Sequence, residues 1–297
     1  MTASVAKLRV GVVVASKGRP DIVSRLVQTL LQQSAPPDAI VVAVSDPADA
    51  AGVIAGGPVA IVMGPTGSCA QRNGGLASLP PAIDIVVFFD DDFIPSRYWI
   101  ERVRDIFAAS PDVAVLTGHV LFDGVKGPGM SWPDGQIIVA RADAAPKPAP
   151  FALKDDFSPY GCNMAFRRTA IGELRFDERL VLYGWQEDTD LAARVAAGGR
   201  MIWSDGLWGV HLGIKGGRTS GRKFGYSQIV NPRYLVAKGT MPTARAITLA
   251  ARNVIANAAG TLWPEPYIDR AGRLHGNLLG LWDIVTGRWR PERAGEL

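Results

Sequence analysis

Residues 88–92 read FFDDD, and this short segment decides how the rest of the chain is interpreted. It completes an apolar run, IVVFF at residues 85–89, and is followed directly by FIP at residues 93–95. Adjacent carboxylates repel one another, and burying one without a partner costs on the order of several kcal/mol. The cluster is therefore either solvated on a loop or the binding place of a cation.

Composition indicates a packed globular protein. The chain has 297 residues, of which 47% are hydrophobic and 20% are charged, enough for one large domain or two small ones. Its two cysteines, Cys69 and Cys162, lie far apart without CxxC spacing, which argues against a disulfide framework or a zinc site and suits a reducing compartment. We see neither a signal peptide nor a membrane-spanning apolar run, so we expect a cytoplasmic protein.

Charge is distributed unevenly along the chain. Residues 215–297 contain 13 Lys and Arg against 5 Asp and Glu, whereas the net charge of the whole chain is +4. An acidic first part and a basic last part suggest two roles. The basic part could face nucleic acid, an anionic membrane or a phosphorylated substrate, or be a solvated surface.

The first 120 residues alternate between strand and helix patterns. Residues 8–16, LRVGVVVAS, form a continuous β-branched run, which is typical of a strand buried on both faces. Further strands are predicted at residues 39–46, 59–63 and 84–92. Helices are predicted from Pro20 through Leu31, at residues 67–79, and at residues 97–110 with Ser96 as the cap. This alternation predicts an α/β fold with an open, largely parallel sheet flanked by helices.

Polar side chains follow the predicted strands at the edge where such sheets bind ligands. Ser16 and Arg19 follow the first strand, Asp46 ends the second, and the acidic cluster ends the fourth. Arg72 and Asn73 precede the fourth strand. An oxygen-liganded cation such as Mg²⁺ or Mn²⁺ would offset the repulsion within the cluster and bridge to a substrate phosphate, so this position favours a metal site.

A second acidic group opens a predicted helix. Glu187, Asp188 and Asp190 follow Trp185, and acids in a first helical turn are stabilised by the helix dipole by about 0.3–1 kcal/mol each. That accounts for one or two of them, while an Asp near a substrate hydroxyl can act as a general base. A short strand then leads to His211, which near an acidic cluster is a candidate metal ligand.

The ordered motifs resemble those of the inverting family-2 glycosyltransferases with a GT-A fold. The resemblance covers roughly residues 8–215 and rests on seven segments: VVVASKGRP, AVSDP, AQRNGGL, FFDDDFIP, GCNMAFRR, GWQEDTDL and GVHLG. It implies a Rossmann-like open mixed sheet in a nucleotide-sugar-binding catalytic domain at residues 1–215. Residues 216–297 would form a basic, mostly helical extension. It also implies an enzyme that moves a hexose from a nucleotide-diphosphate sugar to a hydroxyl, in polysaccharide or glycoconjugate synthesis.

The same resemblance implies a role for each matching residue. Asp92, Asp90 and His211 would hold Mn²⁺ or Mg²⁺ at the diphosphate, and Asp188 would be the base that deprotonates the acceptor. The nucleotide pocket would be lined by Ser16, Arg19, Asp46, Arg72, Asp90 and Asp91, and the acceptor site by Asn163, Trp185 and Glu187. Within that pocket Asp46 would contact the base of the donor nucleotide, although the family's second-strand motif is longer than AVSDP.

Two kinds of segment outside these motifs look functional. The Gly/Pro-rich stretches at residues 122–136 and 142–159 look mobile. The loop after His211 is basic and glycine-rich, with Lys215, Arg218 and Arg222, and it could close over phosphates or be a plain surface loop. The tail carries an apolar face flanked by arginines, made of Leu274, Leu278, Leu281, Trp282, Val285 and Trp289. Such a helix can lie on the inner face of an anionic membrane or pack on the catalytic domain.

We expect a nucleotide-sugar donor and a glycan or lipid-linked saccharide acceptor, and no nucleic acid, as partners. Two other functions fit parts of the pattern. A nucleotidyltransferase would need a glycine-rich phosphate loop after the first strand, where SKGRPD has one glycine. An inactive carbohydrate-binding protein would not need Asp92, Asp188 and His211 together. The sequence leaves the donor, the acceptor and the oligomeric state open.

Overall fold

The computed structural model describes residues 7–145, 151–155, 158–215 and 220–297. A mixed sheet of nine strands runs through the molecule in the order β3-β2-β1-β4-β8-β6-β9-β5, with β7 beside β9. The bounds of the strands are β1 Val10–Ala15, β2 Ala39–Val44, β3 Val59–Met63, β4 Ile85–Asp90, β5 Phe93–Pro95, β6 Val113–Asp123, β7 Leu153–Asp155, β8 Asn163–Arg167 and β9 Arg200–His211.

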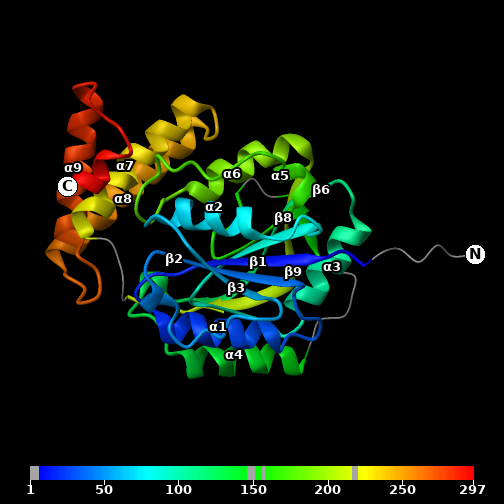
Figure 1. Cartoon of the computed structure of the whole chain (residues 1–297). Coiled ribbons are helices and arrows are strands. Elements are labelled where there is room, and N and C mark those ends of the chain that lie inside the picture. Colours follow the sequence, from blue (N-terminus) through cyan, green and yellow to red (C-terminus); the bar gives the residue numbers. More distant parts are fainter. Residues whose placement is uncertain (1–6, 146–150, 156–157, 216–219) are drawn as a thin grey trace, which may run out of the picture.

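Helices cover both faces of this sheet (Figure 1). The helices of the sheet domain are α1 Pro20–Leu31, α2 Ser68–Ser78, α3 Trp99–Ala109, α4 Trp132–Ala144, α5 Arg168–Ile171 and α6 Glu187–Val195, with short 3₁₀ turns η1 Pro47–Ala50, η2 Gly124–Lys126 and η3 Ala196–Gly198. Side chains of α1, α3 and α4 share one core cluster, and those of α2, α5 and α6 share another. The predicted α/β class and the flanking helices are confirmed.

Strand β1 shows how the sequence produces this layering. Val12 and Val14 belong to the core on the α1 side, and Val13 belongs to the core on the α2 side. All three side chains are fully buried, as expected where both faces of a strand are covered. β1 pairs in parallel with β2 and with β4, which places the ends of these strands at one edge.

The second half of the sheet differs from the largely parallel arrangement that alternation predicts. β8 runs antiparallel to β4 and to β6, and β5 runs antiparallel to β9. The strand before His211 is also long rather than short, because β9 pairs with β6 along its length, with register irregularities on the way. These pairings join segments far apart in sequence, which a local pattern does not reveal.

Part of the segment predicted to be mobile is regular structure. Residues 132–144 form α4, whose first turn is capped by the Ser131 hydroxyl accepting from the amide of Asp134. Trp132 and Val139 are buried against the sheet. Pro133 in the first turn is compatible with a helix start, so the Gly/Pro content there marks an entry to a helix.

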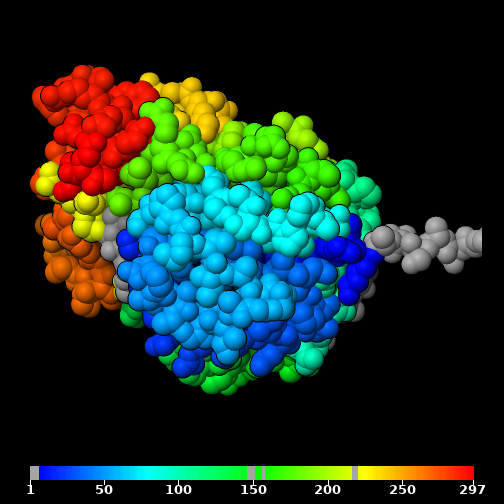
Figure 2. Space-filling model, in the orientation of Figure 1, coloured from blue at the N-terminus to red at the C-terminus, as the bar shows by residue number. Residues whose placement is uncertain are grey.

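Residues 220–297 form a further group of helices. These are α7 Gly221–Lys238, α8 Thr243–Leu262, α9 Arg270–Val285 and α10 Arg293–Glu296. They stand at one end of the sheet, and Figure 2 shows them as a lobe beside the main body. No helix of the described chain combines the length and the apolar character needed to cross a bilayer.

Candidate active site

The acidic cluster lies at the carboxyl end of β4, next to the centre of the sheet. Asp90 is the last residue of the strand, and Asp91 and Asp92 are 1% and 3% exposed. A solvated loop is therefore excluded for two of the three carboxylates. Their burial requires compensating partners, since isolated carboxylates are not tolerated in a core.

Partners for the buried carboxylates come from the end of β1 and from the segment after β9. The Arg19 guanidinium lies 2.8 Å from Asp91 and 3.2 Å from Asp92, and the Ser16 hydroxyl donates to Asp91 at 2.7 Å. The amide of Ile214 donates to Asp92 at 2.8 Å. Burial raises the pKa of Asp91 to about 7, although Arg19 opposes the rise. Ser16 and Arg19 thus bind the cluster itself and lie at the predicted ligand edge.

Three side chains converge at this edge in a form that suits a metal ion. One ligand atom each of Asp90, Asp92 and His211 lies within 4.8 Å of the others. His211 Nε2 is 3.4 Å from Asp92 and 3.8 Å from Asp90. The antiparallel pairing of Phe93 with His211 brings the histidine back to the cluster. Two carboxylates and one imidazole fit Mn²⁺ or Mg²⁺.

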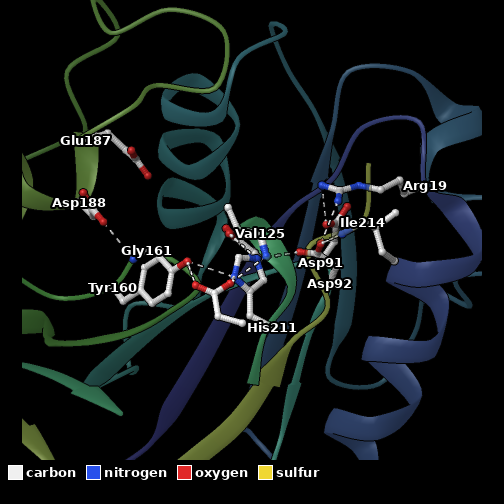
Figure 3. Close-up of polar contacts among 12 residues, drawn as sticks. Arg19, Asp91, Asp92, Val125, Tyr160, Gly161, Glu187, Asp188, His211 and Ile214 are labelled. Atoms are coloured by element: carbon white, nitrogen blue, oxygen red, sulfur yellow. Dashed lines mark hydrogen bonds and ion pairs between the residues drawn. The ribbon is translucent and has the colours of Figure 1, made fainter. Parts of the chain in front are cut away.

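A second layer of contacts orients His211. Its Nδ1 lies 3.2 Å from Asp123 and 3.3 Å from the Tyr160 hydroxyl, and that hydroxyl donates to Asp123 at 2.9 Å. Figure 3 shows the ring between Tyr160 on one side and Asp92 on the other. Because Nδ1 is occupied, Nε2 is directed toward the carboxylates, as second-layer partners of metal-binding histidines usually arrange. Sequence reasoning missed Asp123 and Tyr160, since neither stands in an acidic run.

Arg72 connects the acidic cluster to the second acidic group. It is buried in α2, donates to Asp90 at 2.7 Å and to the carbonyl of Gly161 at 3.2 Å, and forms an ion pair with Glu187. Burial raises the pKa of Glu187 to about 8, while the Arg72 charge opposes the rise. Arg72 therefore holds Glu187 and Asp90 on either side of one guanidinium.

A cavity of about 300 Å³ adjoins Asp90, and Asp188 lines it. Asp188 Oδ2 accepts from the amide of Gly161 at 3.0 Å, and its Oδ1 accepts from the amide of Thr189 at 2.7 Å. Burial raises the pKa of Asp188, and the two amides oppose that rise. Other lining residues come from four segments and include Arg72, Tyr160, Tyr183, Trp185, Glu187 and Arg245. The cavity can therefore present a substrate group to a half-buried carboxylate beside the candidate metal site.

Asp190, the third acid of the helix start, has a different environment. Its side chain is fully buried and binds Arg194 at 2.6 Å, Lys238 at 2.9 Å and the Thr240 hydroxyl at 2.8 Å. These partners join α6 to the end of α7. Asp190 does not line the cavity, so its role in the described structure is to tie helices together.

The second strand leads to two acids rather than one. Asp46 is exposed and caps η1, accepting from the amide of Ala48 at 2.8 Å. Asp49 is 8% exposed and accepts from the amide of Gly18 at 2.6 Å, while its other oxygen is buried without a partner among the described residues. Asp49 thus faces the loop after β1. Its position three residues after Asp46, after the same strand, is the sequence feature from which it could have been predicted as a site residue.

The remaining predicted site residues that the structure describes lie outside the lining of the cavity. Asn163 is buried in β8, where its side-chain oxygen accepts from the Thr117 hydroxyl at 2.7 Å, and it does not line the cavity. Lys215 donates to the carbonyls of Gly124 and Val125 at 3.0 and 2.8 Å. Arg222 is exposed on the first turn of α7, and Arg218 lies outside the described residues.

Comparison with known proteins identifies the fold. No protein-family model and no curated protein matches the sequence. Among solved structures, this chain is similar to the mannosyltransferase PcManGT from Pyrobaculum calidifontis in complex with GDP-Man and Mn²⁺. The similarity covers 94% of this chain and 88% of PcManGT, with 17% sequence identity and a TM-score of 0.58. It is also similar over 80% of its length to 77% of a mycobacterial protein, with 16% identity and a TM-score of 0.52. The chain therefore has the fold of GT-A glycosyltransferases.

Proposed function

We propose that this protein is a metal-dependent, inverting glycosyltransferase of the family-2 type. It transfers a hexose from a nucleotide-diphosphate sugar to a hydroxyl of a glycan or lipid-linked saccharide. The observation that carries the proposal is the convergence of Asp90, Asp92 and His211 within 4.8 Å, beside a cavity lined by Asp188. The GT-A fold supports it, since the similar PcManGT is described with GDP-Man and Mn²⁺.

In this proposal the acidic cluster acts on the donor and the cavity holds the acceptor. A divalent cation held by Asp90, Asp92 and His211 would neutralise charge that develops on the leaving nucleoside diphosphate. Ser16 and Arg19 fix the buried carboxylates on the donor side of that site. Donor binding by Asp46 remains part of the proposal, and Asp49, which faces the loop after β1, is a further candidate in this pocket.

Asp188 is positioned to act on the acceptor. Its carboxylate accepts two backbone amide hydrogens, which hold both oxygens in place at the cavity wall. Burial raises its pKa toward the range in which a carboxylate accepts a proton from a hydroxyl effectively. Attack on the face opposite the leaving group, with the proton passing to Asp188, displaces the diphosphate in one step and inverts the anomeric configuration.

The test is Asp188→Asn, which preserves shape but does not accept the proton. A general base contributes typically about 10²- to 10⁴-fold to the rate, so we expect transfer to fall by about that factor. Donor affinity, measured by calorimetry with UDP-, GDP- and dTDP-sugars and Mn²⁺, should stay near that of the wild type.

Asp190→Asn is the matched control, since Asp190 lies two residues after Asp188 on α6 and forms ion pairs with Lys238 and Arg194. It should lower the melting temperature while keeping most of the turnover per folded molecule. Unchanged turnover in Asp188→Asn, or turnover lost only in Asp190→Asn, would contradict the role of Asp188 as the base.

A further inference from the structure

The C-terminal helices pack through small and polar side chains. On α9, Gly272, Gly276 and Gly280 recur every fourth residue, and on α7 Gly221 and Gly225 do the same. A Cβ at Gly276 would lie 2.1 Å from the carbonyl oxygen of Arg222, so the two backbones are in close contact. Such spacing of small residues permits close helix pairs, most familiarly in membranes.

Amides fill the centre of this helix group. Asn257 and Asn277 are fully buried, and the Asn257 amide donates to Asn277 at 2.8 Å and to Gln228 at 2.9 Å. Asn277 donates in turn to the carbonyl of Gly225 at 2.7 Å. The contact between α8, α9 and α7 is therefore centred on amides and glycines, while Leu249 and Leu279 pack against the neighbouring core clusters.

Eight other large apolar side chains of this region are exposed. On α8 the residues Ile247 and Ile255 are 65% and 68% exposed, and on α9 Val285 is 81% exposed. We call the following exposed residues the outer face: Ile247, Ile255, Leu262, Trp263, Leu278, Leu281, Trp282 and Val285. α8 and α9 are joined by a short connection and meet at Asn257 and Asn277, so the outer face belongs to two helices in contact with each other.

The charge around the outer face is predominantly positive. In the connection between α8 and α9, Glu265 pairs with Arg270 at 2.5 Å, and Asp269 caps α9 by accepting from the amide of Gly272. Arg252 is exposed on α8, and Arg288 is exposed just after α9. The single carboxylate within α8 and α9, Asp283, is 1% exposed and bound by Arg293 at 2.7 Å. A second copy of the chain seated on this face would bring two predominantly positive surfaces together, which is unfavourable. An anionic surface is complementary to the exposed arginines.

The same helices reach the cavity described above. Arg245, in the first turns of α8, lines the cavity with Trp185 and Asp188. Asn231 on α7 donates to the carbonyl of Trp185 at 2.9 Å. A surface held against the outer face would therefore lie alongside the element that forms one wall of the cavity.

We propose that the outer face of α8 and α9 docks onto the surface of an anionic lipid bilayer. The apolar side chains enter the boundary between headgroups and acyl chains, the tryptophans sit at headgroup level, and the arginines contact lipid phosphates. This docking rests on the helices alone and is independent of the proposed reaction.

The test measures co-sedimentation of the full-length protein with vesicles of phosphatidylcholine, with and without phosphatidylglycerol. We expect wild type to bind the mixed vesicles more tightly than the neutral ones. The double variant Ile255→Asp/Leu278→Asp should bind the mixed vesicles at least about tenfold more weakly, since charge on the inserted face opposes entry. Both positions are exposed in the structure, so thermal unfolding should match wild type.

Ile54→Asp is the matched control, because Ile54 is 86% exposed and follows η1, outside the C-terminal helices. It should bind vesicles as wild type does. The proposal is overturned if wild type stays in solution with the mixed vesicles, if it binds neutral vesicles equally well, or if the double variant binds unchanged. It is also overturned if sedimentation without lipid shows a wild-type dimer that the double variant converts to monomer, since a second copy then covers the face.

Discussion

At the scale of single residues, the site depends on side chains that hold the candidate metal ligands. His211 is oriented through Nδ1 by Asp123 and Tyr160. Neither residue is one of the candidate metal ligands. Removing such a second-layer carboxylate typically lowers metal affinity by about 10- to 100-fold. Mutation can therefore distinguish the metal ligands from the residues that orient them, by the size of the loss in metal affinity.

We expect Asp92→Ala to abolish Mn²⁺ binding and Asp123→Asn to weaken it by about 10- to 100-fold. Mn²⁺ titration followed by electron paramagnetic resonance measures both affinities without substrate. Asp46→Asn changes an exposed carboxylate that caps η1 and should leave Mn²⁺ affinity unaltered. EDTA should remove transferase activity, and added Mn²⁺ should restore it. A wild-type affinity in Asp92→Ala would remove the metal role from this cluster.

At the scale of elements, helix α2 contains two adjacent glycines in contrasting positions. A Cβ at Gly74 would meet nothing within 4 Å, whereas a Cβ at Gly75 would lie 2.4 Å from Val13 Cγ1 in β1. Gly75 thus lets α2 approach the sheet closely enough to carry Arg72 beneath the acidic cluster. Gly74 only weakens the helix, because glycine is less favourable than alanine there by about 0.8–1 kcal/mol.

The paired substitutions should have opposite effects on stability. Gly74→Ala should raise the free energy of unfolding by up to about 1 kcal/mol. Gly75→Ala should lower it by about 1–3 kcal/mol, since an added methyl group overpacks the contact with Val13. Urea unfolding monitored by circular dichroism checks both. Equal effects of the two changes would mean that α2 moves away from β1 without resistance.

At the scale of the whole molecule, charged contacts join the sheet domain to the C-terminal helices. Asp177, before α6, accepts from Lys238 at 2.6 Å and from the Tyr234 hydroxyl at 2.7 Å, both on α7. Burial acts to raise the pKa of Asp177, but these hydrogen bonds outweigh it and lower the pKa below its ordinary 3.8. A carboxyl with a lowered folded-state pKa stabilises the fold above its unfolded pKa, and this stabilisation is lost as pH falls through the folded pKa.

Asp177→Asn should therefore lower the free energy of unfolding at pH 7 by about 1.5–3 kcal/mol, the usual contribution of hydrogen bonds to a charged group. The difference between variant and wild type should shrink as pH falls below about 3.8. Urea unfolding across this pH range measures it, with Asp112→Asn as control because Asp112 pairs with Arg200 on the exposed surface. A difference that stays constant down to the lowest pH would contradict a contribution from the Asp177 charge.

Local sequence patterns determined the elements and the edge at which they present polar groups. The apolar runs of β1, β2 and β4 and the helical spacing of α1 are short-range signals, so they could be recognised without the fold. From them followed the α/β class and the place of the acidic cluster at the end of β4.

Only the tertiary structure decided which of these groups meet. Asp123 and Tyr160 reach His211 through the β6–β9 ladder and the segment before β8, and Arg72 reaches Glu187 across 115 residues of sequence. In the tail, the apolar row was visible in the sequence, but its exposure follows from glycines and asparagines occupying the inner side of α8 and α9. Long-range pairing and the choice of inner face depend on partners far along the chain, and no local period encodes them.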